Sequence, residues 1–311
     1  MTQNNEKISI VVAVYNEEEN IQELYNRLKK TLLNDFSNFS HEIIIIDDGS
    51  TDSTFIKLAK IKSQDPTVTG IQLSRNFGHH IALTAGLENA TGTTIVMMDG
   101  DLQDQPEEII KLYNKQQEGY DLVIGTRKER KDNIIKKYTS IFGWWFLNKL
   151  SGLNMQPNQA MLRIFNMKVL KSLQAFKELN RNYPGIFAWI GYKQTTLPIE
   201  HAKRFKGKTK YSFKKMISLT LNATLGFSNK PLYYICYCGL TISSLSIVYG
   251  IYVLLIKVVC NQGIIGWSSM MVLLSFIGGI ILFSLGVIGL YIGRLYQETL
   301  NRPLYIINEK I

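Results

Sequence analysis

Two carboxylates, Asp99 and Asp101, lie one residue apart directly after the apolar run Thr94–Met98. Carboxylates this close repel one another unless a proton or a cation lies between them. Hard oxygen ligands of this kind suit Mg²⁺ or Mn²⁺, which keep several waters and bridge to substrate phosphates. A metal at this position would neutralise a departing diphosphate. The spacing therefore predicts a divalent-metal site, and a purely structural role for the two acids is the alternative.

Polar residues also follow two earlier apolar runs. Tyr15 and Glu17 come after Ile8–Val14, and Asp48 comes after Glu42–Ile46. Acids at such places commonly cap the helix that follows a strand. Carboxylates at two adjacent strand ends can instead bind the hydroxyls and the base edge of a nucleotide. The residues alone leave both interpretations open.

The elements that must position these residues alternate between strand and helix. Five β-branched, apolar runs have the length of buried parallel strands: Ile8–Val14, Glu42–Ile46, Gly70–Leu73, Thr94–Met98 and Leu122–Ile124. Helical patterns lie between them, for example over Glu18–Leu33 and Pro106–Gln117. The alternation predicts a doubly wound, mostly parallel α/β sheet whose ligands bind beyond the carboxyl ends of the strands. For His79 and His80, at an expected helix start, capping or packing is favoured over ligand binding.

The C-terminal part of the chain has a different character. Pro231–Ile256 and Val258–Gly293 contain no charged residue, and about 20 apolar residues suffice to cross a bilayer as a helix. Two transmembrane helices are the expected structure, with a large buried helical hairpin as the alternative. Gly286 and Gly289 in the second span permit packing against a second copy of the chain.

Flanking charges predict the orientation of these two spans. Residues 203–215 include seven lysines or arginines and no acid, and Arg294 and Arg302 follow the second span. The positive-inside rule then puts both termini in the cytoplasm. The expected organisation is a cytoplasmic catalytic domain over 1–200, a basic loop and interfacial amphipathic helix over 201–230, two transmembrane helices over 231–293 and a cytoplasmic tail over 294–311.

Composition excludes several classes of protein. The hydrophobic content of 46% excludes a disordered chain, and three cysteines are too few for a disulfide scaffold. The net charge of +10 would suit nucleic acid or an anionic membrane surface. Because the basic residues cluster beside the apolar spans, membrane lipid explains the charge and no nucleic-acid partner is expected.

Several motifs together resemble glycosyltransferase family 2, which has the GT-A fold. The run Asp101–Glu107 is similar to the DLQDPPE motif of its polyisoprenyl-phosphate branch, and Arg204–Tyr211 resembles the R-x-x-G-x-S-K-Y motif of that branch. The branch includes dolichol-phosphate mannose synthase and bacterial undecaprenyl-phosphate sugar transferases. Residues 161–163 and 201–204 most resemble the undecaprenyl-phosphate 4-deoxy-4-formamido-L-arabinose transferases. The resemblance extends over essentially the whole chain, including the two apolar spans.

The resemblance implies a role for each matching residue. Tyr15, Glu17 and Asp48 would contact the nucleoside of the donor, and Asp99 would bind the donor near its diphosphate. Asp99, Asp101 and Gln103 would bind the metal, Mg²⁺ or Mn²⁺. The catalytic group is Asp101, Arg204 and Lys210, of which the two cations would clamp the leaving diphosphate. Arg127 and Arg130 would receive the lipid phosphate, with a solvated basic surface as the alternative for these two arginines.

The implied activity is an inverting, metal-dependent transfer of a sugar from a nucleotide sugar, expected to be UDP-linked, to undecaprenyl phosphate. The reaction would lie at the cytoplasmic face of the bacterial inner membrane and serve lipopolysaccharide or cell-wall glycan modification. A processive polysaccharide synthase is one alternative, but it would carry Q-x-x-R-W, and none of the four tryptophans follows an arginine. A catalytically silent scaffold or lipid-flipping subunit is the other, and the intact Asp99, Asp101 and Gln103 disfavour it.

One position departs from the family pattern. Many relatives have an acid where this chain has Gln159-Ala160-Met161. A sugar hydroxyl needs a positioned base during attack, whereas a phosphate monoester, with a second pKa of about 6, is already largely ionised at neutral pH. Met161 therefore favours a phosphate acceptor, and it leaves the identity of any general base open.

Overall fold

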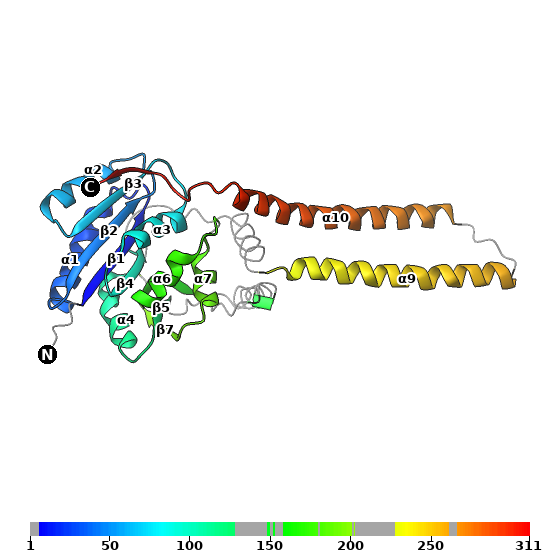
Figure 1. Cartoon of the computed structure of the whole chain (residues 1–311), viewed down its shortest axis with the longest axis horizontal. Coiled ribbons are helices and arrows are strands. Elements are labelled where there is room, and N and C mark those ends of the chain that lie inside the picture. Colours follow the sequence, from blue (N-terminus) through cyan, green and yellow to red (C-terminus); the bar gives the residue numbers. More distant parts are fainter. Residues whose placement is uncertain are drawn as a thin grey trace. The chain divides into compact units, whose positions relative to one another are not determined.

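A computed structural model of the chain describes residues 6–127, 148–149, 152, 158–179, 181–200, 202, 228–260 and 266–311. The chain divides into two compact units (Figure 1). The sheet unit comprises residues 1–145, 153–216 and 302–311, and the helical unit comprises residues 146–152 and 217–301.

An eight-stranded sheet forms the centre of the described part of the sheet unit, with the strand order β7-β5-β6-β4-β1-β2-β3-β8. The strands are β1 Lys7–Val14, β2 Ser40–Asp47, β3 Val68–Leu73, β4 Thr94–Asp99, β5 Leu122–Arg127, β6 Gln159–Asn166, β7 Gln194–Ile199 and β8 Ile307–Lys310. Strands β4, β1, β2 and β3 run parallel, while β6 is antiparallel to both β4 and β5. The predicted mostly parallel α/β sheet is therefore confirmed.

Helices cover both faces of this sheet. They are α1 Ile21–Asp35, α2 Thr54–Gln64, α3 His79–Asn89, the 3₁₀ turn η1 Pro106–Glu108, α4 Ile109–Gln116, α6 Met167–Ala175 and α7 Tyr183–Trp189. The apolar stripe of α1 recurs every three to four residues and packs in the core against alternate residues of β1, such as Ile10 and Val12. On the other face, Gly86 of α3 lies against Val11 and Ile46. Side chains on both faces of β1 are thus buried, as its unbroken apolar run predicts.

The C-terminal segment, expected as a tail over 294–311, contains the end of a helix and an edge strand. Helix α10 continues to Thr299, and β8 then pairs antiparallel with β3 at the edge of the sheet (Figure 1). Ser74 N donates to Ile306 O at 2.9 Å, and Gly70 and Ile311 exchange two backbone hydrogen bonds. The sequence of β8, Ile-Asn-Glu-Lys, is mostly polar, so its hydrophobic pattern carried no strand signal.

The helical unit contains two long helices, α9 Lys230–Cys260 and α10 Trp267–Thr299. Both are long and apolar enough to cross a membrane. They run side by side in opposite directions (Figure 1), and Tyr291 Oη of α10 donates to Ser228 O at 2.8 Å. Large apolar side chains along both helices are exposed, including Leu282 and Phe283. Exposed apolar surface on this scale favours lipid contact over a buried hairpin.

Candidate active site

The carboxyl ends of four parallel strands meet at one edge of the sheet. The register places Asp47 opposite both Val14 and Gln72, and it places Asp99 opposite Ala13. The residues that directly follow β1, β2, β3 and β4 are therefore neighbours, although up to about ninety residues separate them in the sequence. This edge is where a doubly wound sheet binds its ligands.

The turn after β4 is tightly constrained around the two carboxylates. A Cβ atom on Gly100 would lie 2.4 Å from Val14 Cγ1, so the turn passes β1 only because residue 100 has no side chain. Leu102 has φ of 60°, a strained conformation for a branched residue, and its buried side chain holds it there. Gln103 N donates to Asp101 Oδ1 at 3.1 Å, which fixes the largely buried Asp101 carboxylate.

Asp99 forms an ion pair with His79, the first residue of α3, with 2.8 Å between His79 Nε2 and Asp99 Oδ1. Burial lowers the pKa of His79, but the charges of Asp99, Asp48 and Asp101 outweigh it, and the net shift is upward. Burial raises the pKa of Asp99, but His79 outweighs that effect and the net shift is downward. Each group of the pair thus favours the charged form of the other.

His79 was expected to have a capping or packing role, because its partner Asp99 comes from a different strand end and no local pattern links the two residues. His80 behaves as expected for a packing residue. Its ring lies 5.8 Å from that of Tyr183. Burial, followed by the charges of His79 and Arg163, lowers the pKa of His80 to about 3. The two adjacent histidines thus have different roles.

A fully buried arginine, Arg163, lies near Asp99 and Asp104. Arg163 of β6 is fully buried, its Nη2 donates to Gln159 Oε1 at 3.2 Å, and its guanidinium stacks 4.7 Å from the Phe187 ring. Burial lowers its pKa to about 10, while the charges of Asp99 and Asp104 act in the opposite direction. The site therefore contains a buried positive charge close to its carboxylates.

Asp104 has a structural role within the acidic motif, the run Asp101–Glu107. Its Oδ2 accepts hydrogen bonds from Met161 N and Leu162 N, both at 3.1 Å, and its side chain is buried. The carboxylate thereby attaches the loop after β4 to the start of β6. These bonds use the backbone at position 161, so they do not depend on the side chain where this chain departs from the family pattern.

Asp48, the residue directly after β2, binds the loop between β3 and α3. Asp48 accepts hydrogen bonds from Phe77 N at 2.8 Å and from Gly78 N at 3.0 Å. Burial raises the pKa of Asp48, and these bonds only partly offset the increase. Gly49 has φ of 68°, and a Cβ there would lie 2.3 Å from the backbone of Arg75. Only glycine allows the two loops to approach this closely.

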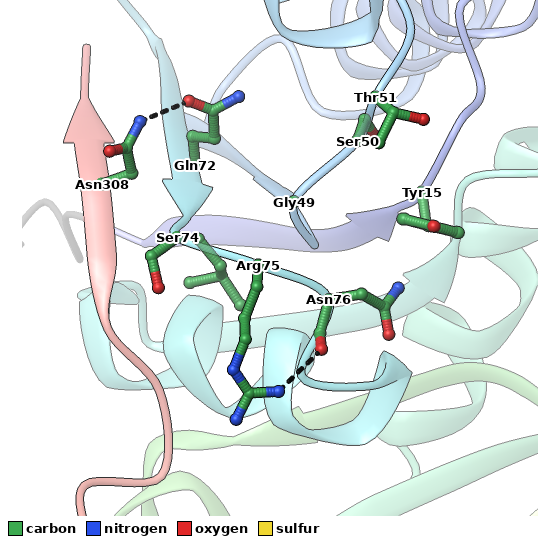
Figure 2. A pocket seen from close by; sticks show the side chains of 10 residues that line it. Tyr15, Gly49, Ser50, Thr51, Gln72, Ser74, Arg75, Asn76 and Asn308 are labelled. Carbon is green, nitrogen blue, oxygen red and sulfur yellow. Dashed lines mark hydrogen bonds between the residues drawn. The ribbon is translucent and has the colours of Figure 1, made fainter.

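A cleft of about 460 Å³ opens at the ends of β1, β2 and β3 (Figure 2). Its volume falls within the roughly 300–1,000 Å³ typical of small-molecule sites. The lining residues are Tyr15, Gly49, Ser50, Thr51, Gln72, Leu73, Ser74, Arg75, Asn76 and Asn308. Of the residues predicted to bind the donor, Tyr15 lines this cleft, whereas Glu17, Asp48 and Asp99 do not. Gln72, Arg75 and Asn308 belong to no recognised motif, and the sequence analysis missed them.

Comparison with known proteins identifies the family. The sequence profile described as Glycosyl transferase family 2 matches residues 9–174. This chain belongs to that family. The protein is therefore a glycosyltransferase, as the motifs predicted.

Relatives of this glycosyltransferase match along nearly its whole length. The uncharacterized glycosyltransferase YkcC of Bacillus subtilis (strain 168) is 39% identical over 302 residues, 97% of this chain and 93% of the relative. The prophage bactoprenol glucosyl transferase homolog of Escherichia coli (strain K12) is 36% identical over 97% of this chain and 98% of the relative. The bactoprenol glucosyl transferase of Shigella phage SfX is 34% identical over 98% and 99%.

Solved structures show the same fold at low sequence identity. The mannosyltransferase PcManGT from Pyrobaculum calidifontis, in complex with GDP-Man and Mn²⁺, is 17% identical with a TM-score of 0.52, over 71% of this chain and 64% of that chain. Glucosyl-3-phosphoglycerate synthase from Mycobacterium tuberculosis, in complex with Mn²⁺, UDP-Glc and glycerol 3-phosphate, is 17% identical with a TM-score of 0.50, over 72% and 79%. The sheet unit of this glycosyltransferase therefore has the expected GT-A fold.

The donor atoms at the end of β4 suit a metal that is shared with a substrate. Among the described residues, no three His, Cys, Asp or Glu side chains gather into a metal cluster. Asp99, Asp101 and the Gln103 amide offer hard oxygen ligands. Mg²⁺ commonly binds through one or two carboxylates, with waters and substrate phosphates completing its shell. The residues present therefore fit a cation held jointly with a diphosphate and do not form an all-protein cage.

Some predicted site residues lie outside the described part of the chain, namely Arg130, Arg204 and Lys210. Arg127 ends β5 with its side chain exposed, and its charge contributes to lowering the pKa of Asp99. Ala202 N donates to Gln103 O at 3.0 Å. Residue 202 of this glycosyltransferase therefore lies beside the acidic motif, two positions before Arg204.

Proposed function

We propose that this glycosyltransferase moves a sugar from a UDP-linked donor to undecaprenyl phosphate, with inversion at the anomeric carbon. The observation that carries the proposal is the position of the cleft, at the same carboxyl edge of the sheet as Asp99 and Asp101, which lie at the end of the neighbouring strand β4. This arrangement suits a nucleoside in the cleft and a diphosphate directed toward the acids. Relatives named as bactoprenol glucosyl transferases match the whole chain, including both apolar helices, and support a polyprenyl phosphate as the acceptor.

The reaction requires stabilisation of the charge on the leaving diphosphate and alignment of the two substrates. An oxygen of the acceptor phosphate forms the new bond to the anomeric carbon, and the bond from that carbon to the donor diphosphate breaks. The electron pair leaves on the nucleoside diphosphate. Mg²⁺ or Mn²⁺ held by Asp99, Asp101 and Gln103 would neutralise that leaving group. Because the acceptor is already ionised, preorganised charge and orientation suffice without a general base.

His79 and Arg163 support this role of Asp99. The ion pair with His79 favours the ionised form of Asp99, and the charge of the buried Arg163 interacts with the same carboxylate. A protonated Asp99 would be a poor metal ligand. His79 and Arg163 thus favour the ionised carboxylate of Asp99, which is the form that binds a metal.

The proposed acceptor site is at the end of β5. Arg127→Ala removes a charge-assisted contact to the lipid phosphate, worth about 1.5–3 kcal/mol, which corresponds to a roughly 10- to 150-fold increase in the KM for undecaprenyl phosphate. The KM for the nucleotide sugar should change far less. Two-substrate kinetics in nanodiscs measures both, with Lys60→Ala, an exposed charge on α2, as the matched control. A variant that loses donor affinity and keeps lipid affinity would move the acceptor site elsewhere.

We further propose that α9 and α10 span the inner membrane with the sheet unit in the cytoplasm. In a cysteine-free background, a membrane-impermeant thiol reagent applied to intact cells should label Gly263→Cys between the two helices. The same reagent should label Ile56→Cys, whose native side chain is exposed in the sheet unit, only after lysis. The reverse pattern would invert the orientation.

Nucleotide release tests the function itself. The purified full chain with UDP-glucose and Mg²⁺ or Mn²⁺ should release UDP faster when undecaprenyl phosphate is added, and should do so in proportion to the lipid supplied. A catalytically silent scaffold would release no UDP under any of these conditions. UDP release that is indifferent to the lipid would contradict the proposed acceptor.

A further inference from the structure

The edge strand β8 brings a residue from the far C-terminus to the cleft. Gln72 of β3 pairs with Glu309, and Leu73 pairs with Ile307, so Asn308 is an extra residue on the β8 side. Such a bulge redirects side chains and is frequent at sheet edges beside active sites. Asn308 is one of the cleft-lining residues and lies across from Gln72 (Figure 2).

A chain of three polar side chains fixes the orientation of the Asn308 amide. The buried Asp47 carboxylate accepts a hydrogen bond from Gln72 Nε2 at 3.2 Å. A carboxylate that is ionised only accepts, so the Gln72 nitrogen faces Asp47 and its Oε1 faces the other way. Asn308 Nδ2 donates to that Oε1 at 2.8 Å. Each amide therefore has one favoured orientation, set by Asp47.

An amide that is held in one orientation can distinguish between nucleobases by the hydrogen bonds that it offers. Asn308 keeps its Oδ1 acceptor and a second N–H for a ligand, and uracil offers an N–H beside carbonyl oxygens. Cytosine has a donor in place of the carbonyl at C4 and an acceptor in place of the N3–H, while its O2 is an acceptor as in uracil. An unconstrained amide would adapt to either base by flipping, but a flip of Asn308 would set its Oδ1 against Gln72 Oε1.

We propose that Asn308 is a specificity-determining residue that contacts the nucleobase of the donor, and that β8 completes the nucleoside side of the cleft. The inference rests on the proposed function, because it requires a nucleotide donor in this cleft. It adds a contribution from a segment that follows both apolar helices in the sequence. The merely structural alternative is that Asn308 only pins β8 to β3.

Calorimetric titration of the full chain with UDP and with CDP separates these possibilities. The parent should bind UDP more tightly than CDP. Asn308→Ala should weaken UDP binding roughly 3- to 10-fold, the value of one hydrogen bond, and should bring the two affinities closer together. Asn308→Asp should weaken UDP binding at least as much, because its carboxylate opposes Gln72 Oε1. Glu309→Gln, on the same strand but not lining the cleft, should leave both affinities unchanged.

The preference between the two nucleotides is the decisive readout, because a loss of β8 pairing alone would not move it. If both Asn308 variants keep the parental ratio of UDP to CDP affinity, the inference is wrong, whatever happens to the melting temperature. If the parent binds neither nucleotide, the proposed donor fails as well. Nucleotide binding that the Asn308 variants leave unchanged overturns the role of Asn308 alone.

Discussion

Asp101→Asn is expected to lower kcat by about 10³-fold, because a bound cation contributes several kcal/mol to stabilising a leaving diphosphate. The asparagine oxygen can still accept the hydrogen bond that Gln103 N donates to Asp101 Oδ1. The fold should therefore survive, and the loss should fall on catalysis. Steady-state kinetics over a titration of Mg²⁺ and Mn²⁺ measures the effect, and EDTA should reproduce it in the parent enzyme.

A matched control lies in the same acidic motif. Glu107 pairs with Arg27 and is exposed, so Glu107→Gln removes a charge nearby without touching the proposed metal ligands. It should retain near-parental turnover. Full activity of the parent in EDTA, or parental turnover in Asp101→Asn, would show that the reaction needs no metal bound at Asp101.

Asp104→Ala is expected to act on stability instead, lowering the free energy of unfolding by about 3–5 kcal/mol. The substitution leaves the amides of Met161 and Leu162 without their acceptor, at about 1–3 kcal/mol for each buried donor. It also removes a nearby negative charge from the buried Arg163. Thermal unfolding in detergent should show a clearly lowered midpoint.

Two comparisons make this prediction specific. Asp104→Asn keeps one acceptor oxygen and should recover part of the loss, while Asp101→Asn should melt at the parental temperature. An unchanged midpoint in Asp104→Ala would mean that the link between the acidic motif and β6 contributes little. Opposite behaviour of the two aspartates would show that one short motif combines a chemical and a structural acid.

The sequence predicted five of the eight strands of the described sheet, β1 to β5, because the signal of a buried strand is local, and it did not predict β6, β7 or β8. Buried parallel strands such as Ile8–Val14 are continuous apolar runs, and the structure extends each predicted strand by only a few residues at its ends. Parallel strands also share a carboxyl edge, so gathering Tyr15 and Asp99 at one place needed no long-range information. Strand β8 had no such signal, because polar residues predominate in it.

The site was harder to predict where contacts join distant loops. Asp48 was predicted to face the donor, yet its carboxylate accepts from two backbone amides of the β3–α3 loop. The pairing of His79 with Asp99 depends on which strand ends are neighbours, and the bond from Asn308 to Gln72 spans 236 positions. No local pattern encodes these contacts, because sheet order and register determine them.

The most direct test of the central claim is the mass of the lipid product. The purified full chain in nanodiscs is incubated with undecaprenyl phosphate, a divalent cation and a panel of UDP sugars, and the lipid is analysed by mass spectrometry. We expect undecaprenyl phosphate carrying one sugar residue, formed in equal amount to the UDP released and strongly reduced with Asp101→Asn. UDP release with the lipid unmodified, or a sugar attached to another acceptor, would contradict this claim.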